Sequence, residues 1–87
     1  MATHEEIVDE QIRMNRVRVT VDVAAYCLRR APLSREEALD VIEHTRKHVL
    51  KLCPGKEQVF ELVLRPRFMR ILTERALAEW NLTDSLN

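Results

Sequence analysis

The sequence is poor in the residues that make tight turns. It has one glycine and three prolines in 87 residues, and neither residue type occurs between Met1 and Arg30. β-Hairpins depend on glycine and a few other residues at their turns, so this composition argues against an all-β fold. It favours long helices joined by few loops, and we expect an all-α protein.

Cysteines and long apolar runs are also scarce. Two cysteines, Cys27 and Cys53, do not make a disulfide framework, and we expect them to be free thiols. No apolar run approaches the roughly 20 residues that cross a bilayer. The first ten residues carry four acidic side chains and no lysine or arginine, whereas a signal peptide begins with basic residues. We therefore expect a cytoplasmic protein with no membrane contact.

The chain has no excess of charge of either sign. Fourteen basic and fourteen acidic residues give a formal net charge of zero, so no overall field attracts nucleic acid or an anionic membrane. The charges are nevertheless grouped, because residues 13–35 are mainly basic while residues 1–10 and 36–43 are mainly acidic. Such blocks suit self-association, but they are also typical of solvated helix faces whose charges interleave in the folded chain.

Apolar residues are plentiful enough for a folded domain. They make up 46% of the chain and charged residues 32%, which excludes a disordered chain and indicates a single domain over residues 1–87. A domain of this size buries only about 60–65% of the surface that its unfolded chain exposes. Association with a partner would therefore add appreciable stability.

Local signals mark the helix ends. Thr3 with Glu6 and Ser34 with Glu37 have the spacing of capping boxes, which open helices. Pro32 ends the first helix, and the turn around Gly55 ends the second. Beyond Gly55 the apolar residues change sides of a continuous helix near Pro66, so we predict a break at that proline. The expected fold is a small bundle of three to four helices at about residues 4–31, 35–52, 56–64 and 66–81.

The long first helix is apolar on two opposite sides. Helical spacing of about 100° per residue separates two stripes. A helix that is apolar on two sides packs against two partners. One partner is the rest of the chain, and the other is a second copy or a different protein. The spacing alone leaves open which stripe faces the core, and the second stripe is our candidate for the oligomer interface. The first stripe comprises Ile7, Met14, Val17, Val21, Ala24 and Leu28, and the second comprises Val8, Ile12, Val19, Val23 and Tyr26.

Residues 16–23 also fit another pattern, because valines alternate with polar residues as in an amphipathic strand. With the helix signal that follows, residues 15–52 resemble the ribbon-helix-helix family of dimeric DNA-binding repressors and antitoxins. The resemblance implies a strand at 16–22 whose Arg16, Arg18 and Thr20 face the DNA major groove. We prefer the helical interpretation because no turn residue separates Val23 from the helix-forming residues after it.

Two clusters are candidates for binding sites. Arg65, Arg67 and Arg70 collect positive charge at the predicted start of the last helix, where an anion or an acidic partner would compensate it. Internal pairing with Glu61 and Glu74 is the alternative, since each lies four residues from one of the arginines.

A weaker candidate is a metal site. Asp40, His44 and His48 recur every four residues on one flank of the second helix, a spacing that can offer two imidazoles and a carboxylate to a metal. No further strong ligand lies nearby in the sequence, and exposed helix histidines are common, so we predict no metal.

The residues contain no catalytic constellation, so we expect neither an enzyme nor a cofactor. The function that the pattern favours is a small helical interaction module, a homodimer that acts as a regulator or accessory subunit by binding another macromolecule. Its first partner is itself, and another protein is a further candidate. Nucleic acid is the partner under the ribbon-helix-helix alternative.

Overall fold

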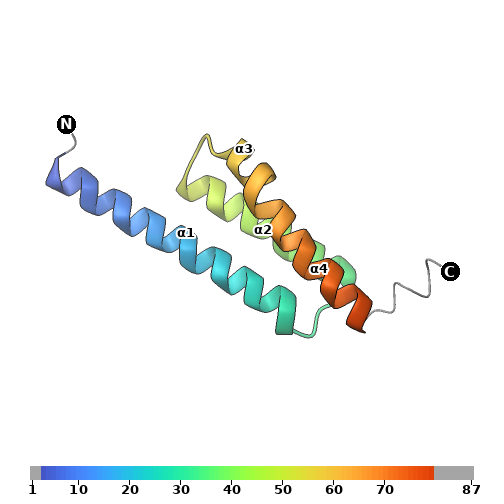
Figure 1. Cartoon of the computed structure of the whole chain (residues 1–87). Coiled ribbons are helices and arrows are strands. Elements are labelled where there is room, and N and C mark those ends of the chain that lie inside the picture. Colours follow the sequence, from blue (N-terminus) through green and yellow to red (C-terminus); the bar gives the residue numbers. More distant parts are fainter. Residues whose placement is uncertain (1–2, 80–87) are drawn as a thin grey trace.

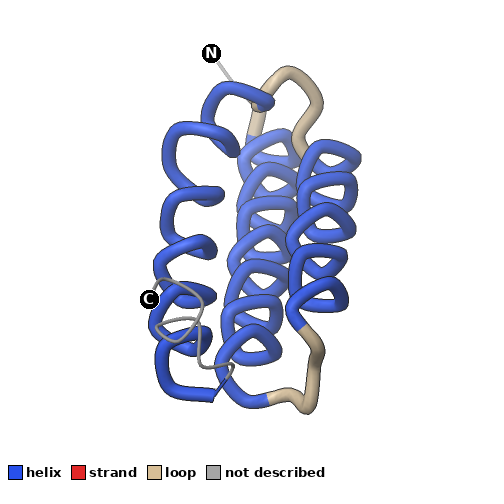
Figure 2. The backbone as a smooth tube through the Cα atoms, turned by 90° about the vertical axis from the view of Figure 1, so that its right-hand side faces the viewer, coloured by secondary structure: helices blue, strands red, loops and turns tan. Residues whose placement is uncertain are grey.

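The computed structural model describes residues 3–79, and all regular structure in that range is helical (Figure 1). Helix α1 spans His4–Arg30 and α2 spans Arg35–Leu52. The short α3 (Glu57–Val59), the π-helix η1 (Phe60–Leu64) and α4 (Arg65–Glu79) follow one another without interruption. The prediction of an all-α bundle is confirmed, with three helical segments side by side (Figure 2).

The first two helices begin where the capping signals place them. The Thr3 hydroxyl accepts a hydrogen bond from the Glu6 amide at 3.1 Å, and the Glu6 carboxylate accepts one from the Thr3 amide at 3.2 Å. Ser34 and Glu37 form the same reciprocal pair at 3.1 and 3.0 Å. Each box satisfies two backbone donors that the start of a helix leaves unpaired.

Residues 16–22 lie inside α1 and are helical. The strand that the ribbon-helix-helix alternative requires is therefore not formed. Helix propensity and the absence of a turn before Ala24 decide the conformation of this segment.

The predicted break at Pro66 is wrong, because the chain stays helical through it. The Arg65 amide donates to the Phe60 carbonyl, five residues back, so one widened turn precedes the proline. In a regular α-helix the Pro66 ring would collide with the carbonyl of Leu62. A widened turn at this position relieves the collision without ending the helix. The predicted residues 80–81 of this helix lie outside the described range.

The widened turn also keeps the apolar residues on one side. Eight residues of regular α-helix would place Phe60 and Phe68 about 80° apart, but one inserted residue makes their spacing equivalent to seven, about 20°. Both rings are buried, with their centroids 6.2 Å apart. The helical spacing of the sequence groups Val59 and Val63 with Phe60 on one side of this segment, but both valines are exposed.

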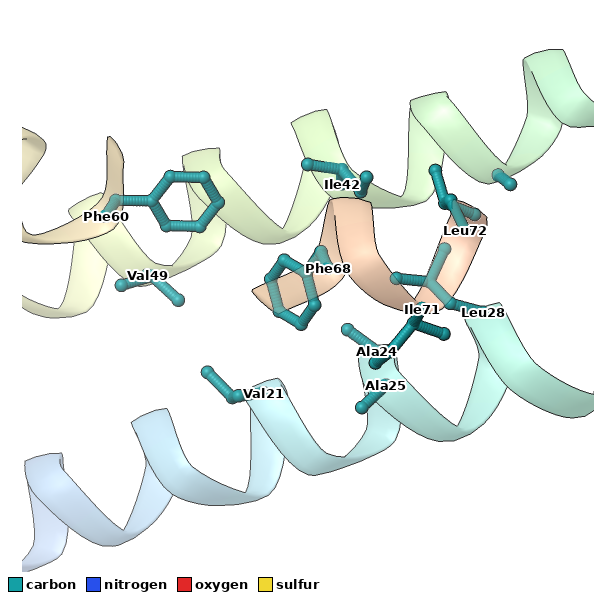
Figure 3. Close-up of a cluster of buried hydrophobic side chains, with 11 residues drawn as sticks. Val21, Ala24, Ala25, Leu28, Ile42, Val49, Phe60, Phe68, Ile71 and Leu72 are labelled. Carbon is teal, nitrogen blue, oxygen red and sulfur yellow. The ribbon is translucent and has the colours of Figure 1, made fainter. Parts of the chain in front are cut away.

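The core lies between the three helical segments (Figure 3). Small side chains on α1 face larger ones on the last segment, which lets the helices approach closely. The buried cluster comprises Val21, Ala24, Ala25 and Leu28 of α1, Ala38, Ile42 and Val49 of α2, and Phe60, Phe68, Ile71 and Leu72 of the last segment.

The core reaches only part of α1. Val17 is the first partly buried residue, and all residues from Thr3 to Arg16 are exposed. With 27 residues against 18, α1 exceeds α2 by about 14 Å. The molecule is therefore elongated, with extents of 58 × 23 × 15 Å and a radius of gyration of 15.8 Å. A compact domain of this length would have a radius of gyration of about 12 Å.

Candidate interaction surface

The second stripe of α1 is solvent-exposed over its whole length. Its five large apolar side chains are between 37% and 67% exposed, from Val8 at one extreme to Tyr26 at the other. The first stripe supplies Val21, Ala24 and Leu28 to the core on the opposite side of the helix. Helix α1 thus packs against its own chain with one side and presents the other to solvent.

An apolar groove between α1 and α2 continues this surface. Ile12, Val19 and Val23 of the second stripe form one wall, and Val41 and Leu52 lie on the α2 side. No described residue of α4 lines the groove, because α4 packs elsewhere on this helix pair. The remaining lining residues are Asn15, Arg16, Thr20, Ala24 and Cys27 of α1 and His44, Thr45 and His48 of α2.

The first stripe also leaves apolar surface exposed near its start. Ile7 is 45% and Met14 55% exposed. Met14 and Val17 line a second hollow, which Val49 and Phe60 close from the other helices. The first stripe is therefore buried against the chain only from Val17 onward.

Arg75 is a buried residue that the sequence interpretation did not single out. Its guanidinium donates hydrogen bonds to the carbonyls of Leu28, at 2.9 Å, and Ala31, at the end of α1, and forms an ion pair with Glu79 at 2.8 Å. A cation at this end of a helix satisfies carbonyls that lack helical partners and opposes the helix dipole. The available signal was the position of Arg75 between Leu72 and Ala76, on the apolar side of its helix.

The three arginines of the predicted anion site do not act together. Arg65 is bound internally, with ion pairs of 2.9 Å to Glu43 and 2.6 Å to Glu61. Glu61 also pairs with Arg46 at 3.0 Å. The hydrogen bond from Arg65 is the main cause that holds the pKa of the Glu61 carboxyl below its usual value, and the same bond raises the pKa of Arg65.

Arg67 and Arg70 are exposed, and neither forms an ion pair within residues 3–79. The expected pairing of Arg70 with Glu74 is not formed. Because the helix is continuous here, Arg65 follows a helical turn instead of opening a new helix. These arginines therefore do not lie at a helix start, where a positive dipole end would favour a bound anion.

The candidate metal ligands remain spread along one flank of α2. Asp40, His44 and His48 are exposed, and across the described part of the chain no group of three or more histidine, cysteine, aspartate or glutamate side chains is arranged to hold a metal ion. His44 and His48 instead border the groove. Both cysteines are free and partly buried, Cys27 beside the groove and Cys53 beside the second hollow.

No helix in the described range is both long and apolar enough to cross a membrane. Comparisons of the chain with protein-family models, with curated proteins and with solved structures find no match.

Proposed function

We propose that this chain is a protein-interaction module that pairs with a second copy of itself through the second stripe of α1. The dimer would act as a regulator or accessory subunit by binding another macromolecule. A cytoplasmic location agrees with the two free thiols.

One observation carries the proposal. Five large apolar side chains lie along the side of α1 that faces away from its own core, interrupted only at Asn15 and Arg16, and an apolar groove borders them. Single exposed apolar residues are ordinary on protein surfaces, but several on one side of a long helix are typical of an interface. The small core gives association a thermodynamic benefit as well.

Sedimentation of a double variant tests the proposal. Val19→Glu with Val23→Glu places two carboxylates in the centre of the stripe, where burial against a partner would be costly. We expect the wild-type protein to sediment as a dimer at micromolar concentration. The variant should be a monomer that keeps its helical circular dichroism, because both side chains are more than half exposed within the chain.

Leu62→Glu with Val63→Glu is the matched control, since these residues are equally apolar and at least 60% exposed but lie on η1. This control should remain a dimer. A wild-type protein that stays monomeric at high micromolar concentration would refute the proposed function. Loss of the dimer in both variants would refute the assignment to the stripe.

A further inference from the structure

We propose that the two α1 helices of the dimer pack antiparallel through their second stripes, about a two-fold axis that crosses this side of the helix at the level of residues 17–18. This inference rests on the proposed function and adds the orientation and register of the second copy. In this arrangement the start of each α1 lies beside the end of the partner's α1.

Four of the five residues of the second stripe are spaced symmetrically about such an axis, and Val19, the fifth, would lie beside Arg16 of the second copy. Val8 and Tyr26 lie nearly equal distances from residue 17, as do Ile12 and Val23. Antiparallel packing therefore sets each of these residues beside the other member of its pair in the second copy. Since Ile12 and Val23 also line the groove, a helix seated on the stripe covers part of the groove too.

Charge decides between the two possible orientations. The first turn of α1 carries Glu5 and Glu6, and the last turn carries Arg29 and Arg30. Glu5 and Arg30 fall within roughly 40° of the centre of the second stripe, so both border the proposed contact. Neither forms an ion pair within residues 3–79.

The same register that joins Ile12 to Val23 brings Glu5 of one copy beside Arg30 of the other, at both ends of the contact. Parallel packing would instead set Glu5 against Glu5 and Arg30 against Arg30. Antiparallel helices also align their dipoles favourably. Both electrostatic effects therefore favour the antiparallel arrangement.

Thiol cross-linking tests the orientation. In a Cys27→Ser, Cys53→Ser background, Val8→Cys and Tyr26→Cys are made in chains of different tag length, and sedimentation first establishes that both remain dimers. An equal mixture treated with a short bismaleimide should give mainly the mixed product. Val8→Cys alone should give little cross-linked product, because the two copies of residue 8 would lie about 27 Å apart along the helices.

Two cross-linking results would overturn the inference. One is efficient self-linking of Val8→Cys and Tyr26→Cys in separate samples, which parallel packing predicts. The other is the absence of any product from a mixture that sediments as a dimer. Neither result would refute dimerisation itself, which sedimentation of the wild type decides.

Charge reversal provides a second test that does not alter the apolar contact. Glu5→Arg or Arg30→Glu alone should raise the dimer dissociation constant about tenfold, because two attractive pairs become repulsive. The double variant restores opposite charges and should return the constant close to the wild-type value. Parallel packing predicts no loss from either single change, and this result would also overturn the inference. Circular dichroism of each variant accounts for the effect of the new charges on the helix ends.

Discussion

At the scale of single residues, Arg75 joins α4 to the carboxyl end of α1. Its side chain is 7% exposed, and its donors reach backbone carbonyls at the end of α1. A buried cation is stable only when it is paired and hydrogen-bonded, and this one has both kinds of partner. Arg75 therefore caps the carboxyl end of α1, because it supplies that end with hydrogen-bond donors from another helix.

Replacing this residue should be costly. Arg75→Met keeps much of the apolar stem but leaves the Leu28 and Ala31 carbonyls without these donors, and we expect a loss of about 2–3 kcal/mol in the free energy of unfolding. Urea denaturation monitored by circular dichroism measures it. Arg70→Met, an exposed arginine on the same helix, is the control and should change stability by less than about 0.5 kcal/mol. Equal effects of the two substitutions would contradict the capping role.

At the scale of elements, some features follow from residues close together in the sequence, and others depend on packing between helices. The capping boxes at Thr3 and Ser34 are readable because each depends on residues three positions apart. The widened turn is not readable from a constant period of about 3.6 residues per turn. On a helix of that period the apolar residues would change sides near Pro66, and either a break or a local change of period would account for the pattern. Only packing against the other helices, which buries both Phe60 and Phe68, decides between the two.

The extra residue in η1 leads to a prediction about deletion. Removing the exposed Leu62 together with Pro66→Ala should convert the widened turn into regular α-helix, with Phe60 and Phe68 still on one side. We expect the helix content to be kept and the free energy of unfolding to change by about 1 kcal/mol or less, since no buried side chain is removed.

Deletion of Lys47 in α2 is the matched control. Lys47 is also exposed, but α2 has no extra residue, so its loss rotates Val49 by about 100° out of the core. This deletion should cost several kcal/mol. Urea denaturation of both proteins compares the two effects. A similar loss in the free energy of unfolding from the two deletions would argue against the view that η1 contains one inserted residue.

At the scale of the whole molecule, the shape follows from the length of α1. Its second half completes a three-helix core, while every residue from 3 to 16 is exposed and none belongs to that core. The two stripes were predictable from helical spacing, and so was the need for two partners. The extent of the core was not, because the point where α1 passes the end of α2 depends on how the helices align. Isolated helical segments of this length are marginal in water, so the first half of α1 has most to gain from a partner.

Truncation separates the two roles of α1. A chain that begins at Arg13 lacks Val8, Ile12 and Glu5, and with Glu5 one member of every proposed charge pair, but it keeps every residue of the core. We expect its monomer to unfold cooperatively with a free energy within about 1 kcal/mol of that of the full-length monomer, since the removed residues are exposed. Self-association should be lost, because Ile12 and Val8 no longer meet Val23 and Tyr26 of the second copy. Urea denaturation at low protein concentration measures the first effect, and sedimentation the second. A truncated chain that still dimerises with unchanged affinity would place the interface elsewhere, whereas one that fails to fold would show that the first half of α1 supports the core.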